Sequence, residues 1–153
     1  MRYTHRFTVR APLAKVAAFH RRAASMAAIT PPPIIVQMHR APVELADGAE
    51  VAFTLWLGPL PLRWQALMDQ VSDHGFRDRM LSGPFASWVH QHRFIPLDGQ
   101  TTEVVDEIEA SLPAGFSRRV VALGMWLGMP LLFAYRAWRT RRLLEPTTQQ
   151  SDT

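Results

Sequence analysis

Between residues 34 and 111, apolar and polar side chains alternate with a period of two, and no other feature of the chain constrains its fold as strongly. Successive side chains of a β-strand point to opposite faces, so this period indicates strands with one buried face. Turn-type residues divide the run at Asp47-Gly48, Gly58-Pro59, Asp73-His74-Gly75, Gly83-Pro84 and Asp98-Gly99. We therefore predict six sequential antiparallel strands, at residues 34–40, 49–57, 61–71, 75–82, 86–96 and 101–111.

The segments on either side of this run add one more strand and three helices. Residues 2–10 alternate cleanly and predict a strand, and Ala11-Pro12 begins a short helix because proline suits the first helical turn. Residues 22–29 predict a second short helix, which Thr30 and three consecutive prolines end. Residues 117–144 predict one long helix. Residues 146–153 form a polar tail that we expect to be disordered.

Composition excludes several kinds of protein. The chain has no cysteine, so it cannot hold a disulfide, a metal–thiolate site or a cysteine nucleophile. Residues 1–145 have the length of one domain. The N-terminus lacks the apolar core of a signal peptide, which predicts a cytoplasmic protein. The uncharged stretch at residues 120–135 is shorter than the roughly twenty residues that a membrane helix needs, so we expect no transmembrane span.

The net charge of +4 raises the question of an anionic partner. On the outward face of the last three strands, arginines alternate with Glu103, Glu107 and Glu109, so no continuous basic stripe forms and we expect no nucleic-acid partner. Basic residues at the end of the long helix either complement the helix dipole in solvent or contact anionic lipid peripherally; they are Arg136, Arg139, Arg141 and Arg142. The chain gives no indication of whether the protein is a monomer or a homodimer.

The order of the expected elements predicts a hollow interior. A seven-stranded sheet has one apolar face, and only one long helix is available to cover it. Because a helix covers a strip only about 10 Å wide, the sheet must curve around the helix and leave a cavity beside it.

The chain resembles the START/Bet v 1-like superfamily, in particular its SRPBCC branch of polyketide cyclase/dehydrase and ligand-binding proteins. The most specific motifs are Gly75-Phe76-x-Asp78, Gly83-Pro84-Phe85-x-x-Trp88-x-His90-x-His92-x-Phe94, Thr102-x-Val104-x-Asp106 and Leu112-Pro113-x-Gly115. Weaker matches are Phe7-x-Val9-x-Ala11-Pro12 and Leu132-Phe133-x-Tyr135-Arg136. The resemblance implies an α+β helix-grip fold, in which a curved seven-stranded antiparallel sheet surrounds a long C-terminal helix, and a cavity for a hydrophobic ligand. It implies no single reaction.

Two histidines and two aspartates form the candidate site. His90 and His92 lie two residues apart and so share one face of a strand. Hairpins at Gly83-Pro84 and Asp98-Gly99 place Asp78 opposite His90 and Asp106 opposite His92. These pairs can serve as buried structural links, as the polar end of the cavity, or in acid–base catalysis or metal binding. Because each histidine already has a carboxylate partner, we predict no metal and no cofactor.

We expect the protein to bind a small hydrophobic or amphipathic molecule, such as a lipid, an isoprenoid or an aromatic polyketide-like compound. The alternative is a cyclase/dehydratase-type enzyme in which His90 or His92 shuttles a proton and Asp78 or Asp106 orients it. The sequence leaves open which of the two holds. The residues expected to contact the ligand are Trp64, Met68, Met80, Trp88, His90, His92, Phe94, Met125, Met129 and Phe133.

Overall fold

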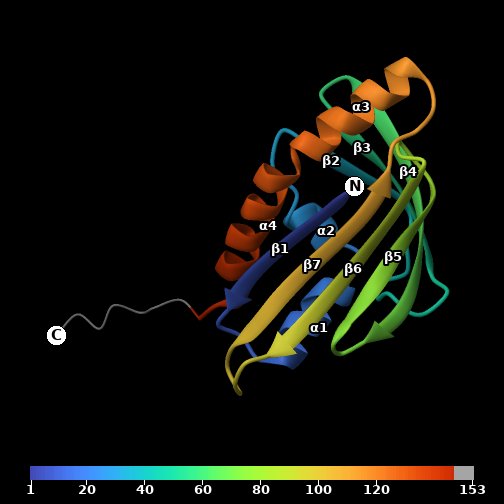
Figure 1. Ribbon diagram of the computed structural model, residues 1–153. Helices are drawn as coiled ribbons and strands as arrows, with labels where there is room; N and C mark the ends of the chain where they lie inside the picture. Colours follow the sequence, from blue (N-terminus) through green and yellow to red (C-terminus); the bar gives the residue numbers. More distant parts are fainter. Residues whose placement is uncertain (147–153) are drawn as a thin grey trace.

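Seven antiparallel strands form one sheet that curves around the helices (Figure 1). This computed structural model describes residues 1–146. Of the polar tail expected at residues 146–153, all but residue 146 lie outside the described residues. The sheet has the order β1-β7-β6-β5-β4-β3-β2. Its strands are β1 (Arg2–Val9), β2 (Ile35–Arg40), β3 (Glu50–Leu57), β4 (Leu60–Ser72), β5 (Gly75–Ser82), β6 (Ser87–Pro96) and β7 (Thr102–Ser111).

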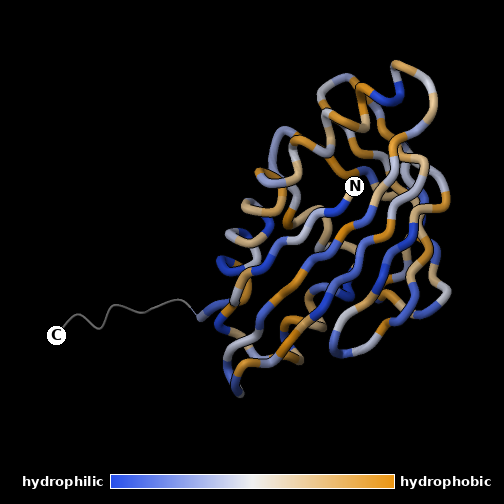
Figure 2. Tube along the Cα trace, in the orientation of Figure 1, coloured by the Kyte–Doolittle hydropathy of each residue, from blue (hydrophilic) through white to orange (hydrophobic). Residues whose placement is uncertain are grey.

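The strands lie where the alternation predicts them, and the two faces differ as expected. Buried and more exposed residues alternate along β4 from Leu62 to Asp69, and the tube in Figure 2 shows hydrophobic and hydrophilic residues interspersed along the strands. The predicted register is confirmed, because Asp78 pairs with His90 across β5 and β6, and His92 pairs with Asp106 across β6 and β7. The hairpin geometry therefore brings all four side chains to one place on the inner face.

Two short helices follow β1. Helix α1 (Leu13–Arg21) begins directly after Pro12 and buries Val16 and Ala17. Helix α2 (Ser25–Ala28) is shorter than the predicted 22–29. Helix α1 packs against β6, and α2 contacts α1 and β2.

The predicted single C-terminal helix is bent into a pair. Helix α3 (Phe116–Leu127) and helix α4 (Met129–Leu144) meet at Gly128 at an angle of 43°. Pro130 lies in the first turn of α4, where its missing N–H leaves no hydrogen bond unmade. In one continuous helix, residue 130 would have to donate its backbone N–H to a carbonyl of the preceding turn, and proline has no N–H. No single helix within residues 1–146 is long and apolar enough to cross a membrane, and α3 and α4 meet that requirement only as the bent pair.

The basic residues of α4 fix this helix to the rest of the protein. Arg139 Nε donates to the carbonyl of Ala28 (3.3 Å), and Arg141 Nε donates to the carbonyl of Thr8 (2.8 Å). Lys15 Nζ donates to the carbonyl of Leu144 at the end of the helix (2.7 Å). Arg139 and Arg141 are half-exposed and Arg142 is exposed, as expected of a helix end in solvent, whereas that expectation is wrong for Arg136, which lines the interior.

Candidate functional site

A cavity of about 470 Å³ lies between the inner face of the sheet and the α3–α4 pair. Strands β3 to β6 form one wall, α3 and α4 form the other, and Met26, Thr30 and Ile34 contribute from the segment around α2. Of the residues expected to contact a ligand, seven line this cavity: Trp64, Met68, Trp88, His90, Met125, Met129 and Phe133.

Three of the expected residues do not line it. Phe94 is fully buried and packs against Phe76 and His20. Met80 lies beside Gly83 in the β5–β6 hairpin. His92 lines a second, smaller cavity of about 110 Å³ near α1 and α2. These positions share the inward parity of their strands, but α1 packs over the end of β6 that carries His92 and Phe94, and Met80 lies next to the β5–β6 turn.

Other lining residues escaped the sequence analysis. Phe85 lies in the turn after Gly83-Pro84, where no strand period applies, although it belongs to the motif described above. Arg136 lines both cavities. Its spacing could have revealed this, because it follows Phe133 by three residues and Met129 by seven and so shares their helix face.

At the polar corner of the cavity, each histidine contacts both aspartates. His90 Nε2 lies 3.0 Å from Asp106 Oδ1, and His90 Nδ1 lies 3.3 Å from Asp78 Oδ2. His92 Nδ1 lies 2.9 Å from Asp106 Oδ1, and His92 Nε2 lies 3.4 Å from Asp78 Oδ2. The contact between His90 Nε2 and Asp106 has hydrogen-bond geometry, whereas His92 Nδ1 is buried without a hydrogen-bond partner.

These contacts fix the charges of the cluster. Burial acts to raise the pKa of Asp78 and of Asp106, but the contacts with His90 and His92 outweigh it and hold both values well below the usual range. Burial acts to lower the pKa of His90, but Asp106 and Asp78 raise it to about 9. At neutral pH the cluster therefore contains two carboxylates and a protonated His90, which reaches the main cavity.

A third histidine lies beside the second cavity in the opposite protonation state. His20 Nδ1 lies 2.9 Å from the carbonyl of Val16, and its ring lies between Phe19 and Phe94. Burial among these groups lowers the pKa of His20 to about 4. His20 is therefore neutral where His90 is charged.

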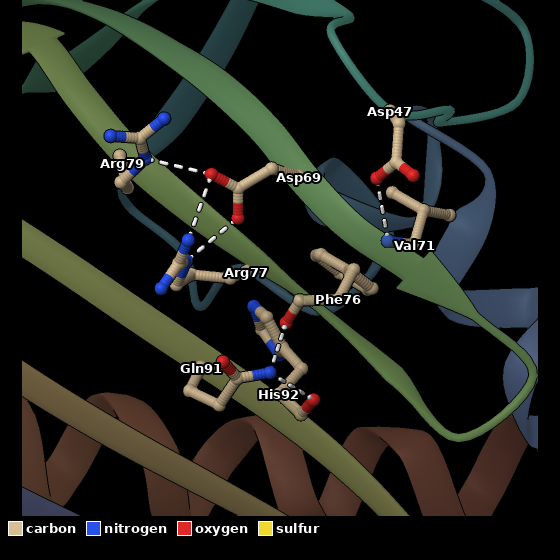
Figure 3. A network of polar contacts seen from close by, with 8 residues as sticks. All are labelled: Asp47, Asp69, Val71, Phe76, Arg77, Arg79, Gln91 and His92. Atoms are coloured by element: carbon tan, nitrogen blue, oxygen red, sulfur yellow. Dashed lines mark hydrogen bonds and ion pairs between the residues drawn. The ribbon is translucent and has the colours of Figure 1, made fainter.

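Polar links on the outer face hold the strands that carry the site (Figure 3). Asp69 of β4 accepts hydrogen bonds from Arg77 Nε (2.7 Å) and Arg79 Nε (2.8 Å) of β5. The side-chain amide of Gln91 donates to the carbonyls of Phe76 (3.1 Å) and His92 (3.3 Å). Opposite charges therefore pair between β4 and β5 on this face.

The donor set also has the composition of a metal site. One ligand atom each from Asp78, His90 and His92 lies within 4.8 Å of the others, and two imidazoles with a carboxylate suit zinc or iron. The same atoms are held by each other and by Asp106. The absence of a bound metal therefore stays a prediction.

No protein-family model and no curated protein matches the chain, but solved structures do. The Zhui aromatase/cyclase from a Streptomyces species has a TM-score of 0.68 at 19% identity, covering 95% of this chain and 96% of its own. Norcoclaurine synthase from Thalictrum flavum, in complex with dopamine and hydroxybenzaldehyde, has a TM-score of 0.66 at 13% identity, covering 94% and 85%. A START superfamily protein from Mycobacterium smegmatis has a TM-score of 0.65 at 11% identity, covering 94% and 97%.

These similarities extend over nearly the whole chain and establish its fold. The protein has the helix-grip fold of the START and Bet v 1-like proteins, as its motifs predicted.

Proposed function

We propose that this protein binds a small hydrophobic or amphipathic molecule in the cavity between the sheet and the α3–α4 pair. The observation that supports the proposal is the cavity itself, which measures about 470 Å³ and has aromatic and aliphatic walls around one polar corner. Binding would bury apolar surface of the ligand, at about 25 cal/mol per Å². Ligand sites commonly combine such walls with a few polar groups that fix orientation.

The compounds that fit this description are lipids, isoprenoids and aromatic polyketide-like molecules. Phe53, Trp64, Phe85 and Trp88 surround the space from the sheet side. Trp64 packs edge-on against Trp88, with ring centroids 5.3 Å apart, which gives the wall a rigid aromatic surface. The norcoclaurine synthase structure, which shares the fold, holds two small aromatic molecules.

A cavity-filling variant tests the site. Ala66 of β4 is 1% exposed and lines the cavity, whereas the neighbouring Gln65 points to solvent. We expect native mass spectrometry of the freshly purified protein to show a co-purified small molecule, which Ala66→Phe loses and Gln65→Phe keeps. A bound molecule that Ala66→Phe retains at unchanged affinity would place the binding site elsewhere.

The second candidate function is catalysis in the same cavity. Its support is His90, which is protonated at neutral pH, reaches the cavity and is held by Asp106 at 3.0 Å. A histidine in this state can act as a general acid and protonate a hydroxyl group that leaves as water. His92 is less well placed for this role, because it faces the smaller cavity.

Turnover separates the two functions. If His90→Asn abolishes conversion of a cavity-bound compound and leaves its affinity unchanged, the protein is an enzyme of the cyclase/dehydratase kind. If the wild-type protein returns its bound compounds chemically unchanged, binding alone is its function.

A further inference from the structure

Arg136 of α4 is a cationic side chain inside a largely apolar interior. It lines both the main cavity and the second cavity, and its guanidinium carbon lies 5.1 Å from the centre of the Phe133 ring. Burial lowers the pKa of its guanidinium, while the charges of Asp106 and Asp78 act to raise it. The side chain thus lies close enough to the polar corner to sense both carboxylates.

Arg136 is half-buried as a residue, and the protein does not satisfy its Nε donor. Its Nε is buried without a hydrogen-bond partner, and within residues 1–146 no carboxylate forms an ion pair with it. Two other arginines of the same helix differ, because Arg139 and Arg141 each donate to a backbone carbonyl. A buried, charged donor without an acceptor is unfavourable, so its persistence at a cavity wall points to an acceptor that arrives with a ligand.

The aspartates do not serve as that acceptor. One oxygen of each aspartate is contacted by His90 and His92, at 2.9 to 3.4 Å, and His90 is protonated at neutral pH. Arg136 interacts with both carboxylates only at longer range, and its Nε stays without an acceptor. The corner therefore presents a protonated His90 and the unpartnered Nε–H of Arg136 to the cavity.

We infer that the cavity ligand carries an oxygen acceptor, a carbonyl or a carboxylate, on an apolar or aromatic body, and that Arg136 donates to this oxygen. The inference rests on the proposed function and specifies its ligand class. It also orients the ligand, because the oxygen then lies at the polar corner beside His90 and the body fills the space toward Trp64 and Met125.

Three naphthalenes of nearly equal shape test the inference by calorimetry. They are 2-isopropylnaphthalene, which has no acceptor, 2-acetylnaphthalene, which has a carbonyl, and 2-naphthoate, which has a carboxylate. We expect the wild-type protein to bind at least one oxygen-bearing probe, and Arg136→Gln to weaken that binding about ten-fold or more while changing the affinity for 2-isopropylnaphthalene less than about two-fold. Whichever of 2-acetylnaphthalene and 2-naphthoate loses more affinity in Arg136→Gln shows whether the ligand oxygen belongs to a carbonyl or to a carboxylate.

Two further variants provide controls. Arg139→Gln, one turn away in sequence and outside both cavities, should change no affinity. Arg136→Lys keeps the charge and loses the planar pair of donors, so it should restore only part of the affinity for the oxygen-bearing probe. Equal weakening of all probes by Arg136→Gln, or no weakening at all, would overturn the inference and leave ligand binding intact.

A measurement on the wild-type protein keeps the test independent of folding defects in the variants. The infrared stretch of bound 2-acetylnaphthalene, labelled with ¹³C at the carbonyl, should lie below its position in a hydrocarbon solvent because of the hydrogen bond. An unshifted stretch overturns the inference. A wild-type protein that binds none of the three probes contradicts the proposed function and the inference together.

Discussion

At the scale of single residues, two histidines have pKa values shifted in opposite directions. The pKa of His90 is raised to about 9 by Asp106 and Asp78 against the effect of burial, and that of His20 is lowered to about 4 by burial. A histidine in the unfolded chain titrates near pH 6.5. Each shift therefore links the stability of the fold to pH, and the two links have opposite signs.

We expect the free energy of unfolding to be greatest near pH 6.5. Above this pH the unfolded chain has lost the His90 proton that the folded protein retains, so the stabilisation by His90 is lost as pH rises toward 9. Below pH 6.5, His20 binds a proton in the unfolded chain but not in the folded protein. The free energy of unfolding therefore also falls as pH drops toward 4. Urea denaturation between pH 4 and pH 9.5 should show both declines, the alkaline one on the order of a few kcal/mol.

Variants assign the two declines. His90→Asn should abolish the alkaline decline, and His20→Phe should reduce the acidic one. His74→Asn is the control, because His74 is exposed in the turn between β4 and β5. An alkaline decline that survives in His90→Asn would show that another group retains the proton.

The sequence predicted which residues meet at this site, but not how they share their contacts. Strand parity and the positions of two hairpins were sufficient to pair Asp78 with His90 and Asp106 with His92. They could not show that each histidine reaches both carboxylates, because this depends on side-chain rotamers and on the twist between strands. Arg136 was grouped with the arginines that follow it at the helix end, although its spacing from Phe133 and Met129 places it on their helix face.

At the scale of elements, the bend between α3 and α4 could not be predicted from the hydropathy of the segment. The uncharged run across this region is continuous, so hydropathy alone indicates one helix. The break depends on a backbone hydrogen bond that Pro130 cannot make, and proline is compatible with both a kinked helix and the start of a new one. The bend matters because residues on either side of it, Met125 and Met129, both line the cavity.

The pairing of β5 with β6 depends on a glycine at the start of β5. Gly75 has φ = +139°, and a Cβ added there would clash with the backbone carbonyl of His92. We expect Gly75→Ala to destabilise the protein by roughly 3 kcal/mol or more in chemical denaturation, because a strained φ and a backbone collision act together. It should also disturb His92 and hence the cluster.

Gly99→Ala is the matched control for this prediction. Gly99 lies in the hairpin between β6 and β7, and an added Cβ meets nothing within 4 Å. Its stability should change by less than about 0.5 kcal/mol. Equal stability of Gly75→Ala and Gly99→Ala would mean that the chain can move away from His92 at little cost.

At the scale of the whole molecule, the cavity follows from a mismatch between sheet and helices. Seven strands present more inner surface than α1, α2 and the bent α3–α4 pair can cover, and the number and order of elements were enough to predict this. The boundary of the cavity could not be predicted, because inward parity assigns Met80, Phe94 and Trp88 to the same face. Phe94 lies near the end of β6, where α1 covers it and His20 packs against it, whereas Trp88 at the start of the strand lines the cavity.

A cavity of this size also couples folding to ligand binding. A molecule that binds the folded state alone, present at 100 times its Kd, adds about 2.7 kcal/mol to the free energy of unfolding, and for a chain of this length each kcal/mol shifts Tm by roughly 2–4 °C. We therefore expect 2-acetylnaphthalene at that excess to raise Tm by roughly 5–10 °C in a thermal-shift assay.

Ala66→Phe should remain folded without the ligand and show no shift, because the added ring occupies the space that the ligand needs. Gln65→Phe, on the solvent side of the same strand, should shift like the wild type. A shift of equal size in both variants would mean that the compound stabilises the protein from its surface, and the hollow between sheet and helices would then be a packing defect rather than a binding site.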